Sequence, residues 1–316
     1  MKNSIKSFGM AFGLALAIAA PSSAAELKMM TGPQGGSWIP IGGQLKDMWE
    51  KAVPNMKVQV LPGAGIANVR GVQEGKAEIG LANSISTADA MQGRKPFNKP
   101  HDGVCNVATL YPQYFQFVVL ADAGINKISD LKGKSITTQQ KGNTGEVITG
   151  HFLEANGLSW DDLKVSRVGY SDSVNLMKDG KAVAFGLNTQ APAGAVMDLS
   201  AARDIKMFEQ KDVYQNMLKL NPSYKLITLP KGTYPKQDKD LTVIGFSTHV
   251  VASCNLPEND VYTMTKTIAA NTKTLATVAK AIATLDPKGM AADIGVKFHP
   301  GAAKFYKEQG ITVKTN

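Results

Sequence analysis

Residues 75–83 read GKAEIGLAN, and residues 180–188 read GKAVAFGLN. Each segment begins with Gly-Lys-Ala, continues through a short apolar run and ends in an asparagine. Upstream, residues 31–37 (TGPQGGS) align with residues 138–144 (TQQKGNT) at nearly the same offset. One such match arises easily by chance, whereas several in the same order indicate that the chain contains an internal duplication.

Each copy of the duplication alternates short apolar runs with helical patterns. In the first copy, Leu45, Met48, Trp49 and Ala52 fall on one face of a helix that ends before Pro54. This alternation is typical of parallel α/β lobes. The expected strands are 27–30, 56–61, 79–82, 134–138, 164–168 and 183–187, and the further expected helices are 68–74, 144–155 and 173–178.

Two long apolar runs, residues 104–110 and 241–253, flank the second copy. Long strands in these places are what two crossovers between lobes would require. A mature chain of about 290 residues also exceeds what one hydrophobic core usually supports. We therefore expect one lobe formed by residues 26–106 plus 246–316, and a second lobe formed by residues 107–245.

The chain has two cysteines, Cys105 and Cys254, and both lie near the expected crossovers. An oxidising compartment would permit them to form a disulfide. Two separate buried thiols are an equally open interpretation.

The N-terminus has the pattern of a secretory signal peptide. Lys2 and Lys6 precede an apolar run at residues 8–20, and small residues follow up to Ala25, where we expect cleavage. The run is shorter than the roughly 20 apolar residues that a membrane span needs. No cysteine lies near the cleavage point, so we expect a protein free in the periplasm.

The formal charge of the chain is +9, and without residues 1–25 it is +7, from 33 Lys and Arg against 26 Asp and Glu. These charges are spread along the sequence, which is compatible with an anionic ligand. Nucleic-acid binding would require a basic stripe with interleaved aromatic residues, and aromatic residues make up only 7% of the chain. We expect no nucleic-acid partner.

Glycine-rich turns precede three expected helices, at residues 35–38, 63–65 and 142–145. In open α/β sheets, ligands bind where the carboxyl ends of strands lead into such turns. Backbone N–H groups at a helix start also favour an anion. The alternative is that Ser37 and Thr144 only cap their own helices. The candidate ligand-binding residues in these turns are Gly36, Ser37, Trp38, Gly65, Asn143, Thr144 and Gly145.

Polar residues that follow expected strands complete the candidate site. Asn83 and Asn188 end matching strands, and an amide can bind either the oxygens or the amino group of a ligand. A role in strand-end turns is the alternative for both. Tyr111 and Gln113 follow the first crossover strand, which places them at the expected cleft wall. Arg167 could pair with a ligand carboxylate, but we favour a surface ion pair.

The sequence offers little support for catalysis or metal binding. The first glycine turn lacks a following Gly-Lys-Ser/Thr, which argues against a nucleotide-hydrolysing loop. The four histidines are isolated and have no metal-ligand spacing. His101, Asp102 and Cys105 leave open a secreted enzyme with a thiol nucleophile, although no oxyanion turn is recognisable beside them. We expect no enzyme activity, no metal and no cofactor.

Long stretches of the chain resemble the TAXI-type solute receptors of TRAP (tripartite ATP-independent periplasmic) transporters. The resemblance implies an α/β, two-lobed periplasmic-binding-protein (Venus-flytrap) fold with two hinge crossovers. It also implies ligand capture by closure and delivery to a TRAP permease driven by an ion gradient. The stretches that carry it are residues 31–45 (TGPQGGSWIPIGGQL), 61–84 (LPGAGIANVRGVQEGKAEIGLANS), 108–119 (ATLYPQYFQFVV), 128–136 (ISDLKGKSI) and 229–246 (LPKGTYPKQDKDLTVIGF).

Characterised members of that family are similar in binding glutamate, glutamine or other small carboxylates. This chain has Trp38-Ile39 where the family usually shows paired tyrosines, and Asn143-Thr144-Gly145-Glu146 where Ser-Gly-Thr-Glu is usual. The resemblance therefore implies a small carboxylate-bearing ligand without assigning glutamate. A dicarboxylate, an oxoacid and an acidic or amide amino acid all stay open.

We therefore expect a monomeric solute-binding protein that works with the membrane subunits of a TRAP permease. A ligand-sensing subunit that presents its ligand to a membrane histidine kinase would have the same sequence features. It remains the main alternative.

Overall fold

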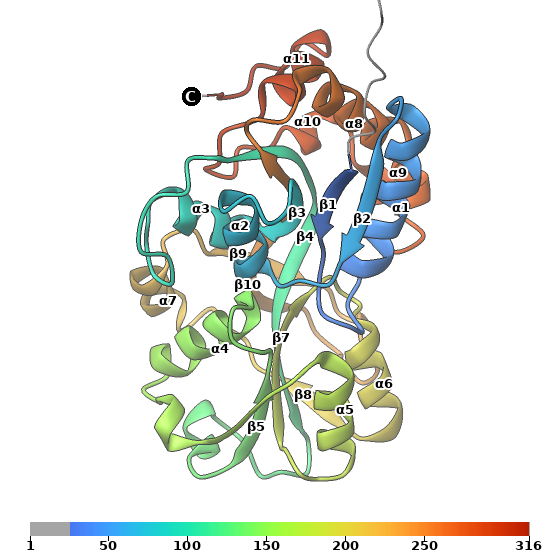
Figure 1. Ribbon diagram of the computed structural model, residues 1–316. Helices are drawn as coiled ribbons and strands as arrows, with labels where there is room; N and C mark the ends of the chain where they lie inside the picture. Colours follow the sequence, from blue (N-terminus) through green and yellow to red (C-terminus); the bar gives the residue numbers. More distant parts are fainter. Residues whose placement is uncertain (1–25, 316) are drawn as a thin grey trace, which may run out of the picture.

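The computed structural model describes residues 26–315. The expected signal peptide, residues 1–25, lies outside the described residues. One ten-stranded mixed sheet runs through the molecule, with helices packed against it (Figure 1). The strands are β1 (Glu26–Met30), β2 (Lys57–Leu61), β3 (Ile79–Asn83), β4 (Val104–Leu120), β5 (Ser135–Thr138), β6 (Lys164–Arg167), β7 (Ala184–Thr189), β8 (Ile205–Met207), β9 (Lys225–Leu229) and β10 (Leu241–Ser253).

The α-helices fall into a group before β4, a group between β5 and β9, and a C-terminal group (Figure 1). They are α1 (Trp38–Ala52), α2 (Gly65–Gln73), α3 (Ser84–Met91), α4 (Thr144–Ala155), α5 (Tyr170–Lys178), α6 (Gly194–Ala202), α7 (Tyr214–Leu220), α8 (Glu258–Ala270), α9 (Thr272–Leu275), α10 (Pro287–Met290) and α11 (Pro300–Glu308). Short 3-10 helices cover residues 128–131, 160–162 and 280–284.

The internal duplication predicted from the sequence is visible in the strand order. The main path of the sheet is β2-β1-β3-β10-β4-β7-β5-β6. In the first copy β1 lies between β2 and β3 and pairs with both in parallel, and in the second copy β5 does the same between β6 and β7. The predicted α/β fold is confirmed. We call the part built on β1–β3 the first half and the part built on β5–β7 the second half.

The strands β4 and β10 connect the two halves. β10 pairs with β9 over Leu241–Gly245 and with β3 over Thr248–Ala252. β4 pairs with β10 up to Tyr114 and with β7 from Tyr114 onward. Both strands thus change partners within a few residues of each other. The two crossovers between lobes stay a prediction.

Each half has its own apolar core. In the first half, Leu45 and Trp49 of α1 are fully buried, and Trp49 Nε1 donates a hydrogen bond to the Met264 carbonyl of α8 at 3.2 Å. The C-terminal helices therefore pack back on the first half (Figure 1). In the second half, Phe115 and Phe152 are buried in contact, with ring centroids 5.4 Å apart.

Cys105 and Cys254 form a disulfide, with Cα atoms 5.2 Å apart. Cys105 lies at the start of β4 and Cys254 directly follows β10, so the bond joins the ends of both connecting strands in the first half. It closes a loop across a sequence separation of 149 residues, which restricts the unfolded chain. Because its sulfur is bonded, Cys105 offers no free thiol for the enzyme that the sequence left open.

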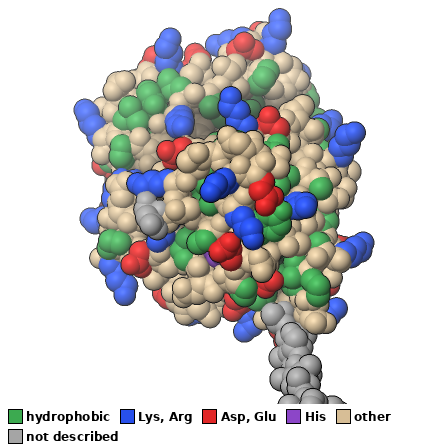
Figure 2. All heavy atoms as spheres, turned by 90° about the horizontal axis from the view of Figure 1, so that it is seen from above, with side chains coloured by type: hydrophobic (Ala, Val, Ile, Leu, Met, Phe, Trp, Pro, Cys, Tyr) green, Lys and Arg blue, Asp and Glu red, His purple; other side chains and the backbone are tan. Residues whose placement is uncertain are grey.

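Charged side chains of both signs are mixed on the surface. Figure 2 shows Lys and Arg side chains interspersed with Asp and Glu over the face of the C-terminal helices, without a continuous basic stripe on that face. Within residues 26–315, no helix combines the length and apolarity required to cross a membrane.

Candidate functional site

A small cavity of about 20 Å³ lies where the two halves meet. Its walls come from the turn before α1, the carboxyl ends of β3 and β7, the middle of β4, and the turns before α4 and α5. This is where ligands bind in open α/β sheets. The lining residues are Pro33, Gly36, Ser37, Trp38, Asn83, Gln113, Gln139, Asn143, Tyr170, Asn188 and Thr189.

Thr248 of β10 orients two of the lining side chains. Its hydroxyl accepts a hydrogen bond from Trp38 Nε1 at 3.2 Å and a second from Gln113 Nε2. Trp38 is only 7% exposed and packs in the apolar core of the first half, yet it also lines the cavity. Trp38 therefore both packs in the core and forms part of the cavity wall.

Ser37 and Thr144 contact residues outside their own helices. The Ser37 hydroxyl makes no capping bond and lies 3.1 Å from the Tyr111 hydroxyl. The Thr144 hydroxyl lies 2.8 Å from the Ser86 hydroxyl of the first half. The alternative in which both residues cap their own helices is therefore wrong. Tyr111 supports Ser37 from behind rather than lining the cavity, and burial raises the pKa of its hydroxyl, which stays protonated.

Asn143 is the residue that caps α4. Its Oδ1 accepts a hydrogen bond from the Gly145 backbone N–H at 3.5 Å. Its Nδ2 is buried and has no hydrogen-bond partner among the described residues. Because Nδ2 is the end of the amide not used by the cap, a hydrogen-bond donor is left over at the cavity wall.

The predicted glycines Gly65 and Gly145 lie beside the cavity wall. A Cβ on Gly145 would overlap Gln139 Oε1 and Asn188 Oδ1, both in the same half as Gly145. A Cβ on Gly65 would overlap the Thr144 hydroxyl of the other half. Gly145 therefore makes room for two lining amides, whereas Gly65 makes room for contact between the halves.

Amide side chains dominate the polar lining, and each has a buried atom without a hydrogen-bond partner. Such atoms are destabilising unless a ligand or water satisfies them. The exposed fractions of these side chains lie between 1% and 5%. The unpartnered atoms are Asn83 Oδ1, Gln113 Oε1, Gln139 Oε1, Asn143 Nδ2 and Asn188 Oδ1.

Residues 29–310 match the sequence profile described as the NMT1-like family. The chain belongs to the NMT1-like family. Its match covers most of both halves, so the family assignment concerns the whole two-part molecule rather than one copy of the duplication.

Solved structures share the fold of this NMT1-like protein at low sequence identity. R. palustris Rpa4515 with adipate has a TM-score of 0.53 and 12% identity, with 83% of this chain and 88% of that chain covered. A protein from Bordetella bronchiseptica RB50 has a TM-score of 0.54 and 14% identity, with 92% and 84% covered. A Streptococcus mutans structure concerned with glutathione import via GshT has a TM-score of 0.52 and 14% identity, with 84% and 99% covered. The fold is that of periplasmic solute-binding proteins.

Seven of the candidate residues predicted from the sequence line the cavity of the NMT1-like protein, and four further lining residues were not predicted. Pro33 and Gln139 fall inside the aligned turns but were not singled out. Tyr170 and Thr189 were not considered. The Tyr170 hydroxyl donates to the Asn188 carbonyl at 2.6 Å and thereby fixes the end of β7. The seven that line the cavity are Gly36, Ser37, Trp38, Asn83, Gln113, Asn143 and Asn188.

Arg167 does not line the cavity. Its Nε lies 3.0 Å from Glu146 Oε1, and its guanidinium lies 4.7 Å from the ring centroid of Trp160. The interpretation of Arg167 as part of an ion pair is confirmed.

Four helices of the NMT1-like protein begin at the cavity. Lining residues occupy the first turn or the cap of α1, α3, α4 and α5. The unpaired N–H groups of a first turn carry partial positive charge. Of the described residues that line the cavity, none carries a formal charge. The electrostatic potential in the cavity therefore comes from helix ends and amide dipoles.

Proposed function

We propose that this chain is a periplasmic receptor that captures a small carboxylate-bearing solute and delivers it to a TRAP permease. The observation that carries the proposal is the set of buried, unpartnered amides contributed by both halves to one cavity. Asn83 and Gln113 reach it from the first half and the connecting strand, and Asn188 and Gln139 from the second half. A ligand that satisfies them would join the two halves.

A carboxylate suits the helix ends that surround the cavity. Backbone N–H groups at helix N-termini bind anions without a lysine or arginine, and no lining residue among those described is cationic. The dicarboxylates, oxoacids and acidic or amide amino acids suggested by the sequence resemblance all contain such a group.

Closure explains how capture could be signalled to a permease. Contacts such as Ala67 N to the Gly142 carbonyl at 3.2 Å, and Ser86 to Thr144, join the halves directly. A ligand bound better by the closed form than by the open form would increase the closed population. The permease would then recognise a surface that exists only when both halves are together.

A ligand screen on the mature protein, residues 26–316, tests the capture step. The melting temperature is followed across dicarboxylates, oxoacids and acidic or amide amino acids, with matched amides and alcohols as neutral controls. A concentration-dependent rise for a carboxylate class is expected. A rise confined to the neutral controls would contradict a carboxylate receptor. Mass spectrometry of the supernatant after denaturation identifies any ligand retained from expression.

The partner is tested by reconstitution with permease subunits encoded beside the gene of this chain. Solute uptake into vesicles should require the receptor and an imposed ion gradient, and it should proceed without ATP. A neighbouring histidine kinase gene in place of permease genes would instead favour the sensor alternative.

A further inference from the structure

We propose that the cavity selects a small monocarboxylate that carries a hydroxyl group and no second charge. This inference rests on the proposed carboxylate receptor and narrows its ligand class. Dicarboxylates and acidic amino acids would then be poor ligands.

Because none of the described lining residues carries a formal charge, the cavity disfavours ligands with more than one charged group. A second carboxylate would be buried without a cation to pair with, and an ammonium group without an anion; both are strongly unfavourable. Arg167 and Glu146 lie in the same half as α4 but pair with each other at 3.0 Å and do not line the cavity.

One carboxylate can be held by neutral groups. The first turns of α1 (15 residues) and α4 (12 residues) reach the cavity from opposite halves. Beside α4, Asn143 Nδ2 is an unpartnered donor, and its orientation is set by the capping bond that Asn143 Oδ1 accepts from the Gly145 backbone N–H. A carboxylate oxygen would satisfy this donor and the helix ends together.

A hydrogen-bond donor on the ligand is required as well. Gln113 uses Nε2 to donate to Thr248, so Gln113 Oε1 is the unpartnered end, and it can only accept. Asn83 Oδ1, Gln139 Oε1 and Asn188 Oδ1 also lack donors. A hydroxyl group next to the carboxylate would donate to one of these oxygens without adding charge.

The size of the cavity points to a short ligand. Its volume is about 20 Å³, the space of roughly one water molecule. The two halves must therefore move apart to admit any ligand, and a chain of a few carbon atoms requires the smallest movement.

A matched set of compounds separates the contributions of charge and hydroxyl. Isothermal titration compares lactate with propanoate, which lacks the hydroxyl, propane-1,2-diol, which lacks the carboxylate, alanine, which has an ammonium group, and malate, which has a second carboxylate. The protein is unfolded, dialysed and refolded first, so that no retained ligand masks binding. Lactate should bind at least ~10-fold more tightly than each of the others.

The outcomes distinguish this inference from the proposed function. Malate or alanine binding as tightly as lactate would overturn the charge argument while leaving a carboxylate receptor. Propanoate binding equally would overturn the hydroxyl argument. Binding of the diol alone would overturn both proposals. Binding of none of the compounds would overturn the inference, and the wider screen would then decide the proposed function.

A charge substitution gives a second readout. Asn188→Asp should weaken lactate binding at least ~10-fold and shift the preference toward alanine, whose ammonium group could pair with the new carboxylate. Asn98→Asp, at an exposed position, is the control and should change neither. If Asn188→Asp does not fold, Asn83→Asp makes the same test from the first half. Unchanged lactate affinity in the folded variant would overturn the inference.

Discussion

Gly65 lies where the two halves of the molecule touch. A side chain at this position would overlap the Thr144 hydroxyl and would come within 2.9 Å of Asn83 Nδ2. Gly65 itself is the first residue of α2 and is buried. It therefore permits close approach between the halves without contributing a polar group to the cavity.

Substituting Gly65→Ala tests whether this approach is required for capture. The added methyl group should hold the halves apart and weaken ligand affinity at least ~10-fold, because the closed form is less populated. The free energy of unfolding without ligand should change little. Titration calorimetry measures the affinity, and denaturant unfolding measures the stability.

Gly43→Ala is the matched control. A Cβ on Gly43, inside α1, would meet no heavy atom within 4 Å. Because alanine favours a helix more than glycine does, this variant should gain roughly 0.5–1 kcal/mol in stability and keep its affinity. Equal affinities in both variants would exclude a role for Gly65 in closure.

His249 of β10 gives the molecule a defined pH dependence. It is fully buried, with Nε2 2.8 Å from the Thr87 hydroxyl and Nδ1 3.0 Å from Asn106 Oδ1. Burial lowers its pKa from 6.5 to about 3. Between pH 6.5 and about 3, His249 is therefore protonated in the unfolded chain but neutral in the folded chain. The free energy of unfolding falls as the pH falls through this range.

We predict that His249→Gln removes this part of the pH dependence. Between pH 7 and pH 5, the stability difference between wild type and variant should shrink by about 2 kcal/mol. Denaturant unfolding at both pH values measures it. Burial also lowers the pKa values of His151 and His299. Both residues are present in wild type and variant, so their contributions to the pH dependence cancel in the difference. Parallel pH profiles would contradict the prediction.

Some residues of the candidate site could be predicted from the sequence because the duplication marked them. Asn83 and Asn188 end equivalent strands, and both line the cavity. Gln139 directly follows β5, so its position at a strand end was an available signal. Tyr170 could not be predicted this way. It is the first residue of α5, and its hydroxyl donates to the Asn188 carbonyl, a contact that exists only once the chain has folded.

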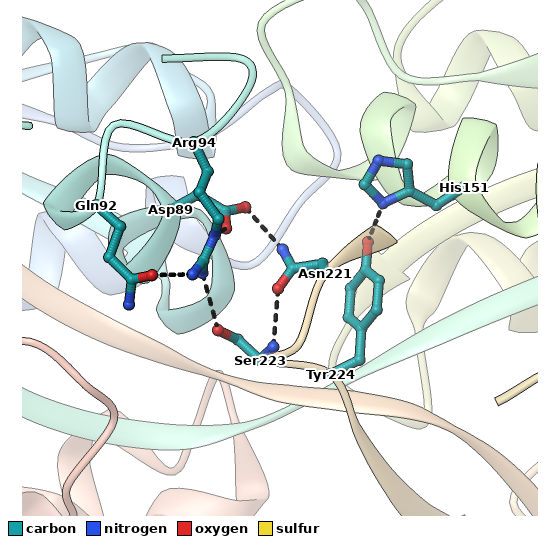
Figure 3. Close-up of polar contacts among 7 residues, drawn as sticks. All are labelled: Asp89, Gln92, Arg94, His151, Asn221, Ser223 and Tyr224. Carbon is teal, nitrogen blue, oxygen red and sulfur yellow. Dashed lines mark hydrogen bonds and ion pairs between the residues drawn. The ribbon is translucent and has the colours of Figure 1, made fainter. Parts of the chain in front are cut away.

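At the scale of elements, a polar cluster joins the end of α3 to the segment after α7 (Figure 3). Asn221 Nδ2 donates to Asp89 Oδ2 at 2.7 Å, and Arg94 lies 2.7 Å from Asp89 Oδ1 and 3.3 Å from the Ser223 hydroxyl. Burial raises the pKa of Asp89, against the opposing effect of Arg94. Beside the cluster, Tyr224 bonds to His151 of α4, which anchors the segment to the second half.

We predict that Asn221→Ala weakens closure without touching the cavity. Asp89 would lose its bond to the second half, and a hydrogen bond to a charged group contributes roughly 1.5–3 kcal/mol. Ligand affinity should fall by about 10-fold or more when measured by titration calorimetry. Asn216→Ala, an exposed position on α7, is the control. An affinity equal to that of the control would show that the cluster only stabilises the fold.

The sequence predicted most elements of the duplicated units but missed α3. All residues of Ser84–Met91 except the last are buried, so the helix has no polar face and no amphipathic period. By contrast, α4 was predicted with its observed bounds, because Asn143 and Gly157 mark its two ends. The small strands β8 and β9 were also missed, since each depends on pairing with a connecting strand.

In the whole molecule, the sequence marked the beginning of the first connecting strand but not its full length. The apolar run of the first connecting strand ends at Leu110, whereas β4 continues to Leu120. Tyr111, Pro112 and Gln113 interrupt the apolar pattern at the level of the cavity, where polar groups are needed. Because these polar residues interrupt the apolar run, the sequence predicts that the strand ends at Leu110 although β4 continues past the cavity.

Affinity measurements on variants of the cavity wall test whether both halves hold the same ligand. Affinity for the carboxylate that raises the melting temperature most is measured in wild type, Asn83→Leu, Asn188→Leu and the double variant, after each is shown to fold. We predict a loss of about 10-fold or more in each single variant and no detectable binding in the double variant. Unchanged affinity in either single variant would contradict capture between the two halves.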